Sequence, residues 1–234
     1  MTALSTNPTP RTSIAPATTA NPSHTGPAAT FTRAALALAG VLFALYPAVR
    51  PWTDETTLAG AAAFASPQWV AAHTMGMVAF ILLSAALLTR AFESGRARTT
   101  AALAATGTAL ILPYYGAETF GLHVIGLRAV ADGDASLLEL ADTVRYGAVP
   151  MTMFGLGLLT LAVAGILLGR EGWRAGGPAR AGGLLTGVML ALYLPQFFGT
   201  PAMRIGHGFL LAIGCILLAI AWGRATSERA TKTP

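Results

Sequence analysis

The sequence predicts an all-α, polytopic membrane protein with six transmembrane helices in one bundle. Hydrophobic residues make up 54% of the 234 residues and charged residues only 11%, against about 45–50% and about 25% in soluble domains. The apolar residues form continuous runs of membrane length, not the alternating pattern of a membrane barrel. Most basic residues lie in the tails and in every second loop between these runs, as topology signals do.

Residues 1–32 are rich in Thr, Pro and Ala and predict a disordered tail, because such a segment buries too little apolar surface to order itself. The first apolar run, residues 34–49, lies between Arg33 and Arg50 and has the length of a signal-peptide core. We interpret it as a retained helix because the preceding tail is long and no small-residue cleavage pattern precedes the acidic loop. Cleavage stays the alternative.

The second span covers about residues 69–89 and has a clear start, since Ser66 suits an N-cap and Pro67 the first helical position. The third span covers about residues 99–121, and its helical stretch can continue to residue 127. That length exceeds the roughly 30 Å hydrocarbon core. We therefore expect its outer end to protrude or to break at one of its glycines.

The loop between spans three and four predicts a short amphipathic helix at 136–145. Ser136 and Glu139 have the spacing of a capping box. We expect this helix to lie on the membrane surface or over the mouth of the bundle. Its apolar face would consist of Leu137, Leu138, Ala141 and Val144.

Spans four, five and six cover about residues 146–168, 181–198 and 205–222. In the fifth, Gly183 and Gly187 have the spacing at which small residues let a neighbouring helix approach closely. We therefore divide the chain into a cytoplasmic tail (1–32), a membrane domain (33–223) and a second short cytoplasmic tail (224–234).

The distribution of the 15 basic residues predicts the orientation. With six spans both termini lie on one side, and the positive-inside rule makes that side cytoplasmic in a cell membrane. The opposite side holds only Arg50, Arg128, Arg145 and Arg204. The cytoplasmic set is Arg11, Arg33, Arg90, Arg96, Arg98, Arg170, Arg174, Arg180, Arg224, Arg229 and Lys232.

This topology places three histidines at the outer ends of their spans: His73, His123 and His207. Polar groups at membrane depth are costly and tend to face a bundle interior or an aqueous cavity. A shared, outward-opening polar pocket is the economical interpretation. Its other members would be Tyr114, Tyr115, Glu118, Tyr193, Gln196 and Arg204.

Two cofactor hypotheses arise from the pocket. In the first, His73, His123 and His207, with Glu118, bind zinc or a similar ion, although no His-x-x-x-His pair occurs. In the second, His73 and His207 are the axial ligands of haem b, and Arg204 or Arg128 meets the propionates. No second pair lies on the inner side to support electron transfer across the membrane.

A third hypothesis is acid/base catalysis by Glu118 on a lipophilic substrate, with Tyr114 and Tyr115 donating hydrogen bonds to a developing oxyanion. The fourth is a non-catalytic sensor, assembly factor or lipid-binding component, in which each polar group sits at the membrane boundary because amphipathic side chains belong there. The fourth is the one we favour. Its partners would be the bilayer and a lipophilic small molecule.

Several functions are disfavoured by residue type. The single cysteine, Cys215, rules out an internal disulfide. No lysine lies within a span, which excludes a retinal Schiff base, and no phosphate-binding glycine loop is present. The net charge of +5 reflects loop arginines acting as topology signals, so nucleic-acid binding is not expected.

Overall fold

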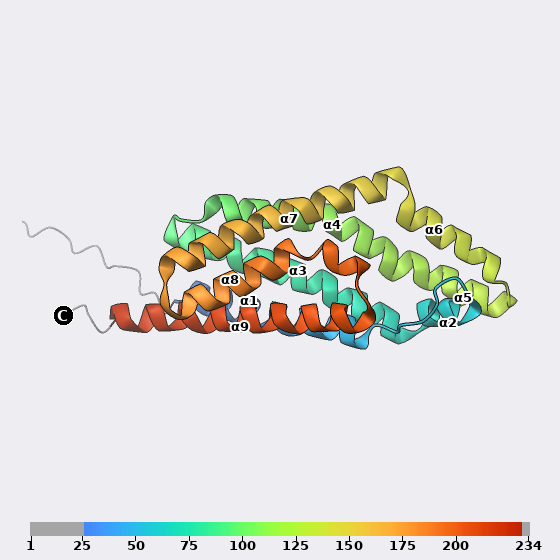
Figure 1. Cartoon of the computed structure of the whole chain (residues 1–234), viewed down its shortest axis with the longest axis horizontal. Helices are drawn as coiled ribbons and strands as arrows, with labels where there is room; N and C mark the ends of the chain where they lie inside the picture. Colours follow the sequence, from blue (N-terminus) through green and yellow to red (C-terminus); the bar gives the residue numbers. More distant parts are fainter. Residues whose placement is uncertain (1–25, 231–234) are drawn as a thin grey trace, which may run out of the picture.

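The computed structural model describes residues 26–230, and every regular element in that range is helical (Figure 1). The predicted tail therefore lies largely outside the described residues, and α1 already begins at Pro27. The long helices are α1 (Pro27–Val49), α3 (Pro67–Ser94), α4 (Arg98–Gly116), α7 (Ala148–Ala175), α8 (Gly177–Ala191) and α9 (Pro201–Ala230). The remaining elements are α2 (Leu58–Ala65), η1 (Ala117–Gly121), α5 (Leu122–Asp132), η2 (Ala135–Leu138), α6 (Glu139–Tyr146) and η3 (Pro195–Phe198).

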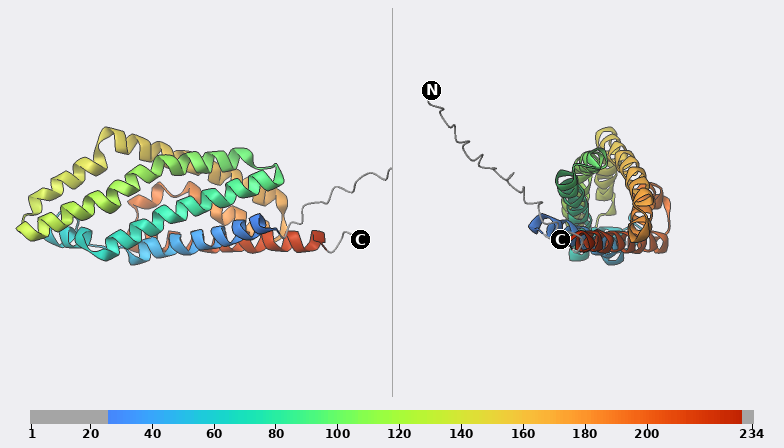
Figure 2. Two further views of the ribbon diagram at one scale, coloured as in Figure 1. Left: turned by 180° about the vertical axis from the view of Figure 1, so that it is seen from behind. Right: turned by 90° about the vertical axis from the view of Figure 1, so that its left-hand side faces the viewer.

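Six long helices form a closed ring in chain order. Each packs against the next, from α1 through α3, α4, α7 and α8 to α9, and α9 returns to α1 (Figure 2). The start of α1 and the end of α9 consequently lie at the same end of the ring. The small helices α2, α5 and α6 extend the molecule at the opposite end, and we call this part the cap (Figure 1).

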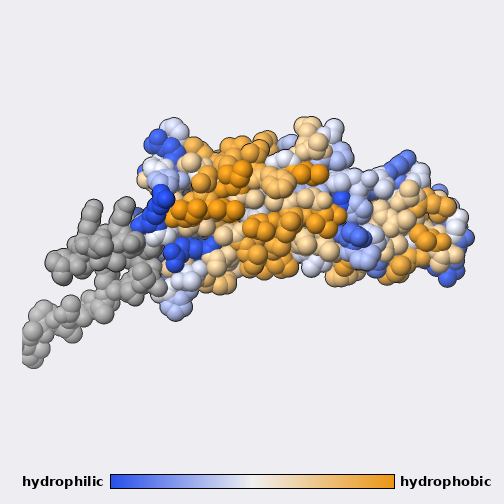
Figure 3. Space-filling view, turned by 90° about the horizontal axis from the view of Figure 1, so that it is seen from below, coloured by the Kyte–Doolittle hydropathy of each residue, from blue (hydrophilic) through white to orange (hydrophobic). Residues whose placement is uncertain are grey.

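Within residues 26–230, four helices are long and apolar enough to cross a membrane: α1, α3, α7 and the part of α9 from Pro201 to Arg224. The other two ring helices do not meet both criteria, because α8 is only 15 residues long and the threonines of α4 reduce its hydropathy. Large apolar side chains are exposed on the outside of the ring, and Figure 3 shows them as a broad belt bordered by polar ends. Such a surface suits contact with lipid, so the fold is that of a multi-pass membrane protein.

Glycines bring α7 and α8 into direct backbone contact. A Cβ added to Gly165 would lie 2.6 Å from the carbonyl oxygen of Gly187, and one added to Gly172 would lie 2.8 Å from Cα of Gly183. The close approach predicted at Gly183 and Gly187 is confirmed. The ring is thus held partly by backbone contacts that no larger residue permits.

The second predicted span begins as expected, because Ser66 Oγ accepts a hydrogen bond from Trp69 N at 3.2 Å and Pro67 follows it. The fifth ends earlier than expected. The α-helix stops at Ala191 and the chain continues through a turn into the 3₁₀ segment that begins with Pro195. Proline lacks the N–H that a continuing helix needs, which explains this stop.

The third predicted span does not break at a glycine. It continues from Arg98 to Asp132 through the π-helical segment η1, a length of about 52 Å at 1.5 Å per residue. The extra residue in a π-turn rotates the residues after it relative to a regular helix. The helix therefore extends past the ring and supplies one wall of the cap.

The cap has its own apolar core, formed by α2, α5, η2 and α6. Leu138 and Ala141 of the predicted apolar face are buried in it, with Leu137 and Val144 partly buried. The start of this segment differs from the prediction, since the carboxylate of Asp134, not Ser136, accepts the capping hydrogen bond at 2.9 Å. Helix α2 lies between the first two predicted spans and was not among them.

Candidate functional site

The polar groups at the junction of ring and cap centre on Glu118, the acidic residue of η1. Trp69 Nε1 of α3 donates a 2.7 Å hydrogen bond to the backbone carbonyl of Glu118. His73 lies one turn further along α3, with Nδ1 donating to the Trp69 carbonyl at 2.9 Å. His73 Nε2 is 3.6 Å from Glu118 Oε2, so these two predicted site residues do lie side by side.

The carboxylate of Glu118 is bound by Arg145 of α6. Arg145 Nε donates to Oε1 at 2.7 Å and Nη2 donates to Oε2 at 3.1 Å, which is the bidentate geometry of a strong pair. The third nitrogen, Nη1, donates to Oε2 of Glu55 at 2.6 Å. Arg50, which follows the last residue of α1, donates to the other oxygen of Glu55 at 2.5 Å.

These four residues form a continuous chain of alternating charges, which we call the latch: Arg50, Glu55, Arg145 and Glu118. It joins the end of α1, the loop before α2, helix α6 and segment η1. Three of the four residues are buried, with 7–8% of their surface exposed. The latch therefore connects the cap to the ring through charges that water scarcely reaches.

Aromatic faces cover both latch arginines. The guanidinium carbon of Arg50 lies 4.8 Å from the centre of the Trp69 ring, and that of Arg145 lies 5.0 Å from the centre of Phe64. Burial alone would lower the pKa of Arg145, but the carboxylates of Glu118 and Glu55 raise that pKa above its usual range. Arg145 thus stays charged.

The two predicted tyrosines lie in different surroundings, and Tyr114 interacts with the carboxylate of Glu118. Tyr115 is buried, and its hydroxyl lies 3.4 Å from that of Tyr193 across the ring interior. Tyr114 stacks on Phe154 of α7, with ring centroids 4.1 Å apart. These contacts give both rings a packing role in the bundle.

His207 and Arg204 of α9 lie beside a different group of side chains. His207 Nε2 donates to the Met189 carbonyl at 2.8 Å, and its ring centroid is 5.3 Å from that of Tyr193. The Arg204 guanidinium lies 4.7 Å from the centre of the Trp52 ring. The cavity between these groups is only ≈ 10 Å³, about the lower limit for a single water molecule.

His123 occupies the cap. Its Nδ1 donates to the Phe64 carbonyl of α2 at 2.9 Å. Across residues 26–230, no three His, Cys, Asp or Glu side chains gather into a group that could hold a metal ion. The predicted histidine cluster and its zinc hypothesis therefore find no support, because the three imidazoles bind separate backbone carbonyls and do not meet at a common point.

The space between His73 and His207 is filled by phenol rings. Tyr46 lies 5.3 Å from His73 and 5.7 Å from Tyr115, measured between ring centroids, and Tyr115 meets Tyr193 as described. The flat gap that a haem would need is thus occupied by the protein's own side chains. The haem hypothesis gains no support from this arrangement.

Sequence reasoning missed the partner of Glu118, although a signal for it was present. Arg145 follows Leu138 and Ala141 at helical spacing, so it lies on the apolar face of α6. A charge at such a position requires a buried counter-charge. Glu118, the acid nearest the membrane interior, was the natural candidate.

Comparisons with known proteins assign the chain to no family. No protein-family model matches it, and neither the curated proteins nor the solved structures contain a significant match. The class of protein accordingly comes from the fold itself: a ring of apolar helices with a latched cap.

Proposed function

We propose that this chain is a non-catalytic component of the cell membrane that works by binding lipid, a lipophilic ligand or a partner, with the latch as a structural element. The observation that carries the proposal is the bidentate ion pair between Glu118 and Arg145. Both carboxylate oxygens accept hydrogen bonds from Arg145. A general base must take up a proton, and the bidentate pair with the charged Arg145 stabilises the deprotonated form of Glu118 and so opposes that step.

The proposal includes six membrane spans. The helices α4 and α8 each lie in the ring between two longer apolar neighbours, so they share the depth of those neighbours. At 1.5 Å per residue, α8 covers about 22 Å, and the turn and 3₁₀ segment to Phe198 extend its path toward the outer surface.

The proposed orientation has both ends of the chain in the cytoplasm. The turns after α3 and α7 lie at the same end of the ring as the start of α1. This end carries Arg33, Arg96 and Arg174, among others. The cap then lies on the outer side, in agreement with the positive-inside rule.

The orientation is tested with reporter fusions in intact cells. A fluorescent protein that matures only in the cytoplasm should be bright after Arg96 and after Arg174, and a phosphatase that is active only after export should be active after Gly133. Export of the fusions after Arg96 and Arg174 would reverse the orientation.

The role of Glu118 is tested with a lipid-soluble carbodiimide, which modifies protonated carboxyl groups in membranes. In the native protein Glu118 should remain unmodified, because Arg145 holds it as a carboxylate. Arg145→Met should expose it to modification, and mass spectrometry of the peptide that contains Glu118 gives the readout. Ready modification in the unaltered protein would mean that the carboxyl is free to exchange protons, and the non-catalytic proposal would then fail.

A further inference from the structure

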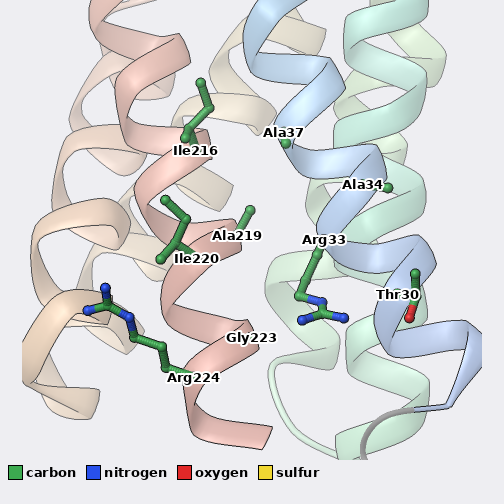
Figure 4. A pocket seen from close by; sticks show the side chains of 9 residues that line it. All are labelled: Thr30, Arg33, Ala34, Ala37, Ile216, Ala219, Ile220, Gly223 and Arg224. Carbon is green, nitrogen blue, oxygen red and sulfur yellow. The ribbon is translucent and has the colours of Figure 1, made fainter. Parts of the chain in front are cut away.

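A groove runs between α1 and α9 at the end of the ring opposite the cap. Its volume is ≈ 590 Å³. Figure 4 shows Ala34 and Ala37 on one wall and Ile216, Ala219 and Ile220 on the other, with the charged side chains near the chain ends. Both walls belong to helices that are apolar enough to cross a membrane, so the groove faces the acyl chains of the bilayer.

The polar end of the groove is cationic. Arg33 reaches from α1 toward α9, and a Cβ on Gly223 would lie 2.8 Å from its Nη1, so the guanidinium lies close to the α9 backbone. Among the described residues Arg33 makes one hydrogen bond, from Nε to the Ala29 carbonyl at 3.3 Å. Its two terminal nitrogens therefore remain able to donate to a ligand.

Arg224 supplies a second cation on the opposite wall. Its side chain is exposed and its guanidinium points away from Arg33 in Figure 4. A long, exposed arginine side chain changes rotamer readily. It is thus free to turn toward an anion held by Arg33.

We propose that the groove between α1 and α9 binds an acidic phospholipid, with the phosphate on Arg33 and Arg224 and an acyl chain along the alanine and isoleucine walls. The apolar wall from Ile216 to Arg224 is about 12 Å long at 1.5 Å per residue, so the groove changes from apolar to cationic along the membrane normal as a lipid changes from chain to headgroup. Basic pockets between membrane helices are a recognised form of lipid site. The site is independent of the latch, which lies at the other end of the ring.

The groove between α7 and α8 provides an internal comparison. It is similar in volume, ≈ 550 Å³, and Arg170 and Arg174 line its polar end. Both of those arginines come from one helix, whereas Arg33 and Arg224 come from two walls. Of these two grooves, the α1–α9 groove is the one in which arginines on both walls can contact a phosphate.

Native mass spectrometry of the full-length protein in a non-ionic detergent tests the proposal. Phosphatidylglycerol and phosphatidylcholine with identical acyl chains are added in turn. The unaltered protein should retain phosphatidylglycerol preferentially. Affinity for it should fall about fivefold in Arg33→Gln and about 30-fold in Arg33→Gln/Arg224→Gln, at the roughly 1 kcal/mol expected per arginine near a membrane surface.

Two further variants separate charge from shape. Arg96→Gln removes an exposed arginine at the same end of the ring but outside the groove, and should leave binding unchanged. Ala37→Phe keeps both cations and fills the apolar wall, and should reduce binding as the arginine variants do. Thermal unfolding of each variant confirms that it is folded.

Three outcomes would overturn the proposal. Equal retention of the two lipids would show that the phosphatidylglycerol charge is not recognised. An equal loss in Arg96→Gln would show a general surface effect. Complete displacement of phosphatidylglycerol by millimolar inorganic phosphate, with Ala37→Phe unaffected, would identify a site for free phosphate instead of lipid.

Discussion

Charged side chains are buried and paired at one end of the ring and line open grooves at the other. At the cap, Arg145 and Glu118 are buried and bind each other, with Arg50 and Glu55 completing the latch. At the other end, arginines line open grooves. The first arrangement fixes one structure, because an unpaired charge there would be costly. The second leaves cations able to meet a ligand.

A second contrast concerns how the helices approach each other. Near α7 and α8 the contact is backbone on backbone through paired glycines. Near the cap, large aromatic side chains such as Trp69 and Phe64 fill the space, with their ring centroids 4.6 Å apart. Glycine contacts tolerate no added atoms, whereas the aromatic packing surrounds and desolvates charge. The cap is therefore the part of the molecule where electrostatics should matter most.

The largest expected effect comes from breaking the latch. Arg145→Met leaves Glu118 buried without its partner and should destabilise the fold by about 3–5 kcal/mol. The matched control is the exposed pair of Arg128 and Asp132, 2.6 Å apart, where the arginine is 72% exposed. Arg128→Met should change stability by about 0–0.5 kcal/mol. Chemical unfolding in detergent micelles measures both.

The double variant Glu118→Leu/Arg145→Met sharpens this test. The double variant removes both charges, so neither Glu118 nor Arg145 remains buried without the other. Its loss of stability should be clearly smaller than the sum of the losses in Glu118→Leu and Arg145→Met measured separately. Additive losses would show that the two residues act separately and that the latch is not a coupled unit. An equal effect of Arg128→Met would point to overall charge in place of burial.

The next largest effect should come from the glycine contacts. Gly165→Leu places a side chain against the Gly187 carbonyl and should cost about 1–3 kcal/mol or more, as overpacking does. Gly155, on the same helix, has open space where its Cβ would lie, so Gly155→Leu should be close to neutral. Thermal unfolding compares the pair, and similar losses in both would mean that helix α7 tolerates no leucine for reasons unrelated to α8.

The sequence predicted the helical class and several local features well. Continuous apolar runs and the Ser66 cap depend on short-range rules, and these hold in the structure. The apolar face of α6 was also recognised, and Leu138 and Ala141 are buried. Helix α2 was missed because its eight residues carry no distinguishing period and lie in a loop-like context.

The candidate site was only partly predictable. Topology gives the depth of each histidine but not the side of the helix on which it lies, so His73, His123 and His207 were expected to share a pocket. In the structure they bind three separate backbone carbonyls. The π-segment that turns Glu118 toward Trp69 depends on packing between distant parts of the chain.

The smallest expected effect is at Asp134, an exposed residue that forms the N-cap of η2. Its hydrogen bonds with Ser136 lower the pKa of this carboxyl below the ordinary value of 3.8. A lowered pKa means that the carboxylate stabilises the fold above pH 3.8, and that this contribution is lost as the pH falls through the lower folded value. Hydrogen exchange of η2 and α6, corrected for intrinsic rates, should therefore show less protection in acid than at pH about 5.

Asp134→Asn removes the titrating group and should abolish that difference, while protection in α7 stays the same. A pH response retained in Asp134→Asn would assign the effect to another group in the cap, and Glu139 on the first turn of α6 is the next to test.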